Sequence, residues 1–301
     1  MTTFARSTFS AKAYAAFRPA YPPSLFRTVL SYHQLPASGG ALLDLGCGHG
    51  LIARYLKPNF KSVLAIDPSA GMIAQAQQTT ADPDITFRQG SAEDLSFLPD
   101  GSVDMAVAGQ AAHWFDYGKV WPNLARVVRP GGTVAFWGYK DNVLLGAEHV
   151  TEIMEEFIYG FDEVAPGLGW TGMGPCWEQP GRNILRDLLR SVQPLESDWA
   201  DVKRLEHEPG KEGTEETCWL RKNMKLGEVD SYLRTFSCFS AWKDAHPGAK
   251  SRAEGGDGDI FDIMWDRIID AVPEWKAMGD RWRKADAVSD WGTYILMARR
   301  R

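Results

Sequence analysis

The sequence has few cysteines, and none of them is spaced for a metal or redox site. Only four are present among 301 residues: Cys47, Cys176, Cys218 and Cys238. No pair shows the C-x-x-C spacing, and no two histidines form an H-x-x-x-H pair. We therefore predict no metal, and reduced thiols of the kind found in cytoplasmic proteins.

Long apolar runs and clusters of basic residues are also missing. No uninterrupted apolar stretch approaches the roughly 18 residues that a membrane helix needs, so no membrane association is predicted. The first residues, MTTFAR, lack the hydrophobic region of a secretory signal, although Arg6 and Lys12 leave a transit peptide as the alternative. The net charge is −6, and apart from residues 299–301 basic residues do not cluster, so nucleic acid is not an expected partner.

Strand-like and helix-like segments alternate between residues 41 and 138. The first expected strand is a short apolar run at residues 41–45, and further strands are expected at 62–66, 85–88, 103–108 and 133–137. Helix-like segments extend to residue 57 and cover 69–78 and 117–128, and the sequence RPGG at 129–132 predicts a turn. This alternation predicts an α/β fold with a doubly wound, mostly parallel sheet and right-handed crossovers.

Strand-like and helix-like segments no longer alternate regularly outside this core. Helices are expected at residues 7–18, 22–32, 147–159, 182–191, 227–244 and 259–271. Residues 202–206 and 291–298 are strand-like and are expected to pair as an antiparallel edge of a seven-stranded sheet. The chain is predicted to form one domain over residues 1–301. Its expected parts are an N-terminal helical cap at 1–40, a ligand-binding core at 41–139, cap insertions with an edge strand at 140–290, and a final strand and tail at 291–301.

Three successive strand ends carry residues suited to bind a nucleoside. Residues 44–50 read DLGCGHG between a strand and a helix, where glycines let the backbone approach a ligand closely. Their spacing does not fit the G-x-G-x-x-G pattern of dinucleotide enzymes. Asp67 closes the second strand, and its carboxylate can accept hydrogen bonds from both hydroxyls of a ribose. Residues 90–94, GSAED, follow the third strand, where an adenine can lie on backbone amides and a polar side chain.

With these three strand ends in this order, residues 40–138 resemble the class I S-adenosylmethionine-dependent methyltransferases. The resemblance implies a Rossmann-like fold, S-adenosyl-L-methionine as the cofactor and S-adenosyl-L-homocysteine as its product. It implies that Asp44 and the glycines surround the methionine part, that Asp67 holds the ribose, and that Gln110 lies beneath the sulfonium. The whole implied cofactor-binding set is Asp44, Gly46, Cys47, Gly48, Gly50, Asp67, Pro68, Met72, Ser91, Ala92, Glu93 and Gln110.

A closer resemblance, over most of the chain, is to the fungal trans-aconitate methyltransferases and their relatives. It rests on residues 7–10 (STFS), 18–22 (RPAYP), 112–116 (AHWFD), 137–139 (WGY), 174–182 (GPCWEQPGR) and 232–237 (YLRTFS). Residues 174–182 lie outside the shared cofactor fold, so their match is the more specific signal. The resemblance suggests trans-aconitate as the methyl acceptor.

Arginines are the candidates for holding such an acceptor. Methyl transfer from a sulfonium is an in-line displacement, and a carboxylate with a reference pKa of about 4 needs orientation rather than a strong base. Arg182 is the first candidate to bind a substrate carboxylate, followed by Arg18 and Arg234. The alternatives are a surface ion pair for Arg182, anchoring of the N-terminal segment for Arg18, and a solvated face for Arg234.

The catalytic candidates are His113 and Tyr139. His113 either donates to the acceptor or acts as a base if the acceptor is a hydroxyl, and the alternative is a structural histidine. Tyr139 either hydrogen-bonds the acceptor or is a buried tyrosine with one partner. The remaining predicted substrate-binding residues are Tyr21, Trp114, Trp137 and Trp177, for which core packing is the alternative.

The prediction is therefore an O-methyltransferase that forms a methyl ester on a small carboxylic acid. One alternative is a larger fungal secondary metabolite with a carboxyl, hydroxyl or other acceptor group. A second is a non-catalytic cofactor-binding regulator. A nucleic-acid methyltransferase is disfavoured because residues 109–112 read GQAA, where such enzymes often carry N-P-P-Y. The expected partner is a small acidic or natural-product molecule, and the protein is expected to be a monomer or homodimer.

Overall fold

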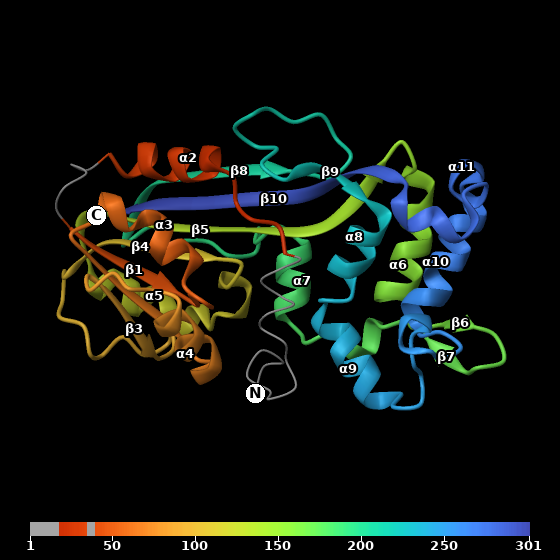
Figure 1. Ribbon diagram of the computed structural model, residues 1–301. Coiled ribbons are helices and arrows are strands. Elements are labelled where there is room, and N and C mark those ends of the chain that lie inside the picture. The colour runs from red at the N-terminus through yellow and green to blue at the C-terminus, as the bar shows by residue number, and fades with distance from the viewer. Residues whose placement is uncertain (1–17, 35–39) are drawn as a thin grey trace. The chain divides into compact units, whose positions relative to one another are not determined.

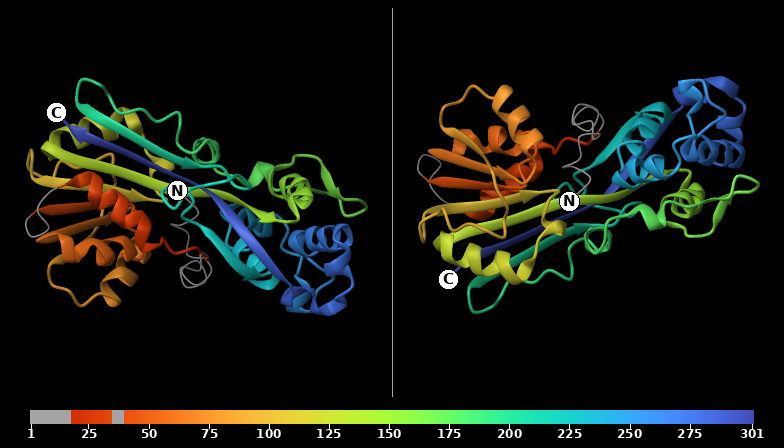
Figure 2. Two further views of the ribbon diagram at one scale, coloured as in Figure 1. Left: turned by 90° about the horizontal axis from the view of Figure 1, so that it is seen from above. Right: turned by 90° about the horizontal axis from the view of Figure 1, so that it is seen from below.

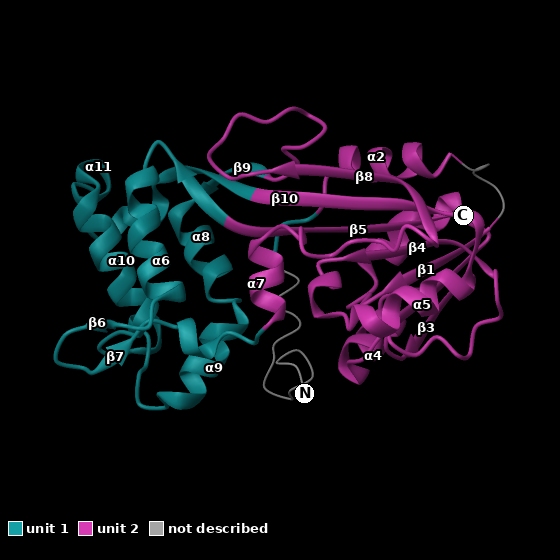
Figure 3. Ribbon diagram, turned by 180° about the vertical axis from the view of Figure 1, so that it is seen from behind, with its two compact units in different colours: residues 1–20, 142–179, 221–291 teal, residues 21–141, 180–220, 292–301 magenta. Residues whose placement is uncertain are grey.

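The structure, a computed structural model, describes residues 18–34 and 40–301 (Figure 1). Apart from Arg18, the predicted helix at 7–18 lies outside these residues. The chain forms two compact units (Figure 3). Among the described residues, unit 1 comprises 18–20, 142–179 and 221–291, and unit 2 comprises 21–34, 40–141, 180–220 and 292–301. The predicted core at 41–139 lies wholly in unit 2, whereas the predicted cap insertions at 140–290 contribute to both units.

Unit 2 is built on a mixed sheet with the strand order β3-β2-β1-β4-β5-β10-β8. Its strands are β1 (Ala41–Leu45), β2 (Ser62–Asp67), β3 (Ile85–Gln89), β4 (Val103–Gly109), β5 (Val128–Leu145), β8 (Trp199–His207) and β10 (Asp286–Arg300). The first five pair in parallel, and β8 pairs antiparallel with β10. The predicted α/β class, the mostly parallel sheet and the antiparallel edge are confirmed.

Helices cover both faces of this sheet, as the two views of Figure 2 show. They are α2 (Pro23–His33), α3 (Leu51–Leu56), α4 (Ala70–Gln78), α5 (Tyr117–Val127) and α7 (Gly181–Arg186), with short 3-10 turns η2 (Lys57–Asn59) and η3 (Ala112–Trp114). Side chains that accept backbone hydrogen bonds fix two helix starts: Ser69 caps α4 and Asp116 caps α5. The helices therefore begin close to the carboxyl ends of β2 and β4.

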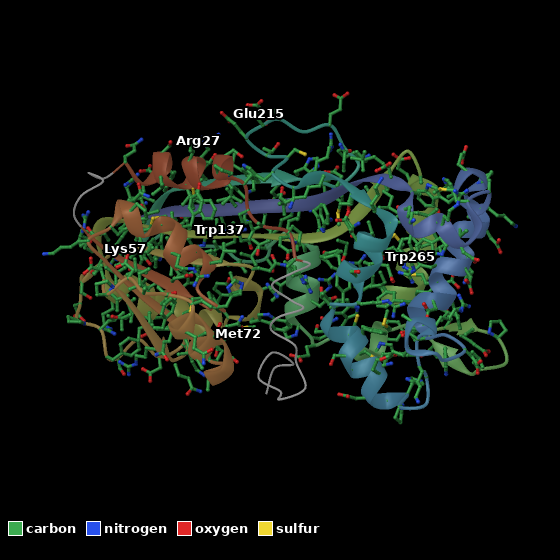
Figure 4. All side chains as sticks on the ribbon, viewed as in Figure 1. Arg27, Lys57, Met72, Trp137, Glu215 and Trp265 are labelled. Atoms are coloured by element: carbon green, nitrogen blue, oxygen red, sulfur yellow. The ribbon has the colours of Figure 1, made fainter. Side chains whose placement is uncertain are left out.

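The core of unit 2 lies between the sheet and these helices. Trp121 of α5 packs on Phe136 of β5 and on Trp199 of β8, with ring centroids 5.6 Å apart in each pair. All three rings are at most 3% exposed, and burying an aromatic or large aliphatic side chain contributes about 1.5–3 kcal/mol. In Figure 4, Trp137 lies inside the unit while Arg27 and Glu215 point outward. This packing holds the strand ends in fixed relative positions.

Unit 1 is mainly helical. Its elements are α6 (Thr151–Tyr159), α8 (Leu226–Leu233), α9 (Ser237–Ala245), α10 (Ile260–Ala271), α11 (Pro273–Lys276), β6 (Glu163–Ala165), β7 (Trp170–Thr171), β9 (Arg221–Lys225), η4 (Glu148–Val150), η5 (Gly174–Cys176), η6 (Arg252–Glu254) and η7 (Gly279–Lys284). Strands β6 and β7 form a small antiparallel hairpin, and β9 pairs antiparallel with the first residues of β10. Trp265 of α10 is buried and donates to Asp230 of α8, which ties these two helices together. None of the helices in the described residues is both long and apolar enough to cross a membrane.

Several predicted boundaries are wrong. The turn expected at residues 129–132 lies inside β5, which starts at Val128. The helix expected at 182–191 ends at Arg186, and the one expected at 227–244 is two helices separated by residues 234–236. The sequence also gave no prediction of β6, β7, β9 or α11.

Candidate functional site

The glycine loop after β1 has a backbone that suits glycine at three positions. Gly46, Gly48 and Gly50 have φ values of 67°, 54° and 85°, in the left-handed region that side chains disfavour. A Cβ on Gly46 would lie 2.5 Å from Ala111, and one on Gly50 would lie 2.7 Å from the Phe87 ring. At Gly48 nothing lies within 4 Å of that position. Gly46 and Gly50 therefore permit packing, and Gly48 presents bare backbone to open space.

Asp44 is a buried carboxylate immediately before this loop. It is fully buried, and neither carboxylate oxygen has a hydrogen-bond partner among the described residues. Burial raises the pKa of Asp44 to about 7; the nearby backbone N–H of Ala53 opposes this shift, and the Asp67 carboxylate adds to it. A buried acceptor without a donor is costly. A bound group that carries N–H donors and positive charge, such as the ammonium of S-adenosylmethionine, supplies what Asp44 lacks.

Asp67, at the end of β2, is tied to both neighbouring turns. Its carboxylate accepts hydrogen bonds from the backbone N–H of Gly48 at 2.9 Å and of Ser69 at 2.8 Å. Burial raises the pKa of Asp67, and these two amides oppose the shift. Cys47 is also buried, and burial raises the pKa of its thiol well above the usual value. The Asp67 carboxylate keeps lone pairs for a diol because each of its oxygens can accept more than one hydrogen bond.

The predicted adenine residues flank the same edge. Met72 lies buried in α4, and Gln89 donates to the carbonyl of Pro68. Beyond β3, Ser91 donates to the Glu93 carboxylate, whose other oxygen accepts from the backbone N–H of Asp116 at 3.0 Å. The loop after β3 is thus joined to the start of α5.

Gln110, which follows β4, connects that strand to β5. It has a φ of 56°, its backbone N–H donates to the carbonyl of Trp137 at 2.8 Å, and its side-chain amide bonds the backbone of Tyr139. The side-chain amide of Gln110 thus uses one hydrogen and one lone pair to hold β5. Gln110 positions the strand that carries two of the predicted acceptor-site residues.

His113 and Trp114 form the short η3 turn after β4. His113 is 5% exposed, and its ring centroid lies 4.7 Å from that of Trp114. A Cβ on Gly181, the first residue of α7, would lie 2.5 Å from the Trp114 ring and 3.0 Å from the His113 carbonyl. The start of α7 therefore packs directly on the turn that carries both residues.

Arg182 follows Gly181 and is buried, with 8% of its surface exposed. Its guanidinium forms an ion pair with Asp141 of β5, and Arg186 lies 3.3 Å from the other oxygen of the same carboxylate. The structure thus brings Arg182 next to η3, as the predicted acceptor site requires, and gives it a carboxylate partner that the sequence analysis did not identify.

Tyr21, Trp137 and Tyr139 also come together in unit 2. The Tyr21 ring centroid lies 6.0 Å from that of Trp137 and 6.2 Å from that of Tyr139. Phe26 of α2 packs edge-on against Trp137 at 6.0 Å and stacks on Tyr55 at 3.9 Å. Both β5 aromatics are buried, and the indole N–H of Trp137 has no hydrogen-bond partner among the described residues.

Arg18, Trp177 and Arg234 belong to unit 1. The Arg18 guanidinium lies 5.3 Å from the Phe236 ring centroid and donates to the Thr235 carbonyl at 3.2 Å. Trp177 lies 5.6 Å from the same Phe236 ring and donates to the Ile158 carbonyl. Arg18 and Trp177 therefore share Phe236, a residue that the sequence analysis quoted only within a motif.

Arg234 is surrounded by carboxylates instead. It forms ion pairs with three aspartates, Asp230, Asp259 and Asp262, whose side chains are at most 4% exposed. These contacts give Arg234 a structural role in joining α8 to α10. Its predicted role in binding a substrate carboxylate stays untested.

Comparisons with known proteins agree on one activity. A family model described as "Methyltransferase domain" matches residues 43–136. A Saccharomyces cerevisiae protein named a probable S-adenosylmethionine-dependent methyltransferase, CRG1, is 28% identical over 272 residues, which cover 84% of this chain and 87% of that protein. A methyltransferase structure from Anaeromyxobacter dehalogenans has a TM-score of 0.64 at 26% identity and covers 94% of this chain and 98% of its own.

The chain is an S-adenosylmethionine-dependent methyltransferase. The class I fold, the enzyme class and the cofactor predicted from the sequence are confirmed. A further relative, the methyltransferase gedG of Aspergillus terreus, is 33% identical over 130 residues, which cover 42% of this chain and 41% of gedG. Residues 43–136, which the family model matches, contain the carboxyl ends of β1, β2, β3 and β4. Bound there, the cofactor would supply a methyl group on a positively charged sulfur.

Proposed function

We propose that the cofactor lies along the carboxyl ends of β1 to β4 in unit 2. Asp44 and the bare backbone at Gly48 would hold the methionine part, and Asp67 the ribose hydroxyls. Ser91 and Ala92 would face the adenine. The support for this placement is the fit of donors and acceptors: an unpartnered buried carboxylate, open space at Gly48 and a carboxylate fixed by two amides.

An Asp67→Ala variant tests this placement. The loss of the ribose acceptor should raise the Kd for S-adenosylhomocysteine by about tenfold or more. Asp100→Ala is the matched control because Asp100 is exposed and pairs only at the surface with Arg126. Equal Kd values for the Asp67 variant and the unaltered protein, measured by isothermal titration calorimetry, would remove Asp67 from the cofactor site.

We further propose that the methyl acceptor is a carboxylate oxygen of a small organic acid, with trans-aconitate as the first compound to test. The observation that carries this proposal is the position of Arg182. It is buried, it already holds one carboxylate, and it directly follows the glycine that touches Trp114. A planar guanidinium binds a carboxylate through two parallel hydrogen bonds, which fixes the direction of the oxygen that reacts.

In this proposal the protein aligns the acceptor with the methyl group and excludes water, and no residue removes a proton. The acceptor is already ionised at neutral pH. Arg182 would orient it, while Trp114 and the Tyr21–Trp137–Tyr139 group would form apolar walls. Holding two reactants in an in-line geometry contributes about 7–11 kcal/mol to lowering a barrier. His113 and Tyr139 would donate hydrogen bonds to the acceptor.

The direct test is transfer of a labelled methyl group from S-adenosylmethionine to trans-aconitate, with citrate, isocitrate and cis-aconitate as comparisons. Arg182→Ala should raise the KM for the acid by about tenfold or more and leave the KM for the cofactor nearly unchanged. Arg190→Ala is the matched control because Arg190 pairs with Glu206 and Glu208 at the surface. Equal effects on both KM values would exclude Arg182 as the residue that binds the acid.

A second candidate is a hydroxyl acceptor on a larger metabolite. The observation that favours it is the buried His113 in the turn after β4, since a hydroxyl needs a base where a carboxylate does not. A rate that rises with pH through the titration of a histidine, and that loses this dependence in His113→Asn, would favour the hydroxyl. The predictions of a cytoplasmic location, of no nucleic-acid partner, and of a monomer or homodimer go with either candidate.

A further inference from the structure

The loop after β3 lies beside Asp67 and carries an unusual pairing of two side chains. Strands β2 and β3 are in register with Asp67 opposite Gln89, and the N–H of Gly90 donates to the Asp67 carbonyl at 3.1 Å. Ser91 follows directly and is partly exposed, while Ala92 is buried. The side chain at position 91 therefore lies at the sheet edge where the proposed cofactor site continues past the ribose.

The Ser91 hydroxyl has one hydrogen to donate and two lone pairs to accept with. Its hydrogen is committed to the Glu93 carboxylate. One lone pair accepts from the backbone N–H of Glu93 at 3.2 Å. What remains to a ligand is one lone pair, so Ser91 can accept a further hydrogen bond but cannot donate one.

Glu93 is itself held in place, so the Ser91 hydrogen stays bonded to the Glu93 carboxylate. The second oxygen of its carboxylate accepts from the N–H of Asp116 at 3.0 Å. Its backbone carbonyl accepts from the side-chain amide of Asn123 at 2.9 Å. One contact comes from the N-cap of α5 and the other from within that helix. They keep the carboxylate against Ser91, and a negatively charged partner strengthens the hydroxyl as an acceptor.

The next residue offers the opposite group. Within the described residues, nothing accepts a hydrogen bond from the backbone N–H of Ala92. An acceptor at Ser91 beside a donor at Ala92 matches adenine, whose 6-amino group donates and whose N1 accepts. A 6-oxo purine presents an acceptor and a donor in the reverse order and mismatches at both places.

We propose that Glu93 is a positioning residue for the cofactor's adenine: by holding the Ser91 hydrogen, Glu93 forces Ser91 to accept from the 6-amino group. This inference rests on the proposed placement of the adenine at the loop after β3. It goes beyond that placement by naming a residue, Glu93, that controls how Ser91 receives the adenine without itself touching the ligand.

The experiment compares Kd values for S-adenosylhomocysteine and its 6-oxo analogue, S-inosylhomocysteine, by isothermal titration calorimetry. Ser91→Ala should weaken binding of the adenine compound by about tenfold and leave the 6-oxo compound nearly unchanged. In Glu93→Gln the amide oxygen can still accept from Asp116, which turns the NH₂ group toward Ser91. The serine hydrogen is then free to donate, so the preference for adenine should fall by about tenfold or more.

Two further variants separate this role from a structural one. Ser91→Asp combined with Glu93→Gln places an acceptor directly at position 91 and should restore the adenine preference. Asp94→Asn is the matched control because Asp94 is exposed, carries the same charge, and accepts from the backbone N–H and the side chain of the nearby Ser96. It should leave both Kd values unchanged. If residue 93 acted only on the structure, Glu93→Gln would weaken the binding of both ligands equally. Adding Ser91→Asp would then not restore it.

A bulky variant, Ser91→Tyr, distinguishes failure of the inference from failure of the placement. Loss of binding in Ser91→Tyr would mean that the adenine lies at this loop. If Ser91→Ala and Glu93→Gln then keep the ratio of the two Kd values, the proposed selection is wrong. If Ser91→Tyr leaves the Kd for S-adenosylhomocysteine unchanged, the adenine lies elsewhere, and both the placement and the inference are overturned.

Discussion

The side chain of Gln110 and the backbone of Tyr139 are hydrogen-bonded in both directions. The amide nitrogen of Gln110 donates to the Tyr139 carbonyl at 2.8 Å, and its amide oxygen accepts from the Tyr139 N–H at 2.8 Å. This reciprocal pair continues the connection between β4 and β5 beyond the last ladder contact, Gly109 opposite Trp137. The segment of β5 that leads to Asp141 is therefore anchored from the end of β4.

Replacing Gln110 by Glu should destabilise unit 2. The carboxylate can still accept from the Tyr139 N–H, but it faces the Tyr139 carbonyl with a second acceptor. We expect the free energy of unfolding to fall by about 1–3 kcal/mol, measured by urea denaturation. Gln193→Glu makes the same chemical change at an exposed residue and should be nearly neutral. Equal stabilities of the two variants would contradict the anchoring role.

Gly181→Ala should impair methyl transfer without weakening cofactor binding. The added Cβ would lie 2.5 Å from the Trp114 ring, so that ring or the start of α7 must move. We expect kcat/KM for the acceptor to fall by about tenfold or more, since small displacements of positioning groups are costly. The Kd for S-adenosylhomocysteine should change little. Gly248→Ala is the control because nothing lies within 4 Å of its added Cβ; similar losses in both variants would contradict the prediction.

Asp44 should give the protein a specific pH dependence of stability. Its pKa is about 7 in the folded protein and about 3.9 in an unfolded chain, so the folded state binds the extra proton between these values. The stability associated with the protonated carboxyl is fully present below about pH 4 and is lost as the pH rises through about 7. The steepest loss is about 1.4 kcal/mol per pH unit.

Urea denaturation of Asp44→Asn between pH 5 and pH 8 checks this dependence. The variant cannot ionise at position 44, so its stability relative to the unaltered protein should rise with pH and level off above about pH 7. Asp100→Asn, at an exposed position, should run parallel to the unaltered protein. A parallel curve for the Asp44 variant as well would show that this carboxyl titrates normally.

Arg234→Ala should destabilise unit 1 strongly. Removing the guanidinium leaves the buried Asp259 without its ion pair and takes one from Asp230 and one from Asp262. Breaking one side of a buried ion pair costs about 3–5 kcal/mol. Arg267→Ala removes an exposed pair with Glu156 and should cost about 1 kcal/mol or less. Thermal unfolding of both variants provides the comparison, and a stable Arg234 variant with a raised acceptor KM would instead support the substrate role.

The strand ends that form the cofactor edge could be predicted because each depends on a local pattern. The run at 41–45 is mostly apolar, those at 62–66 and 85–88 contain branched or aromatic residues, and polar or glycine residues follow each one. Parallel strands bring such ends to one edge without further information. Residues 129–132 show the limit of this reasoning. Val103 pairs with Val128 and Met105 with Thr133, so the PGG sequence is absorbed as an irregularity within the ladder and does not end the strand.

The contacts that decide the acceptor site depend on tertiary structure and leave no local signal. Nothing near Asp141 indicates a partner 41 residues away at Arg182. Likewise, residues 228–244 contain no glycine or proline that would predict a break. The helix nevertheless ends where Arg234 bonds three aspartates and the N–H groups of Thr235 and Phe236 turn back to Tyr232 and Leu233. Strand β9, RKNMK, has no apolar alternation and forms because the start of β10 pairs with it.

The place of β10 in the sheet has a consequence for synthesis of the chain on the ribosome. It is the last described strand to emerge, yet it lies between β5 and β8 in the strand order. Until it is made, the apolar segment of β5 keeps an open edge, and β8 lacks its hydrogen-bonded neighbour. Unpaired edges of this kind attract other chains. The nascent protein should therefore depend on chaperones until translation has passed β10.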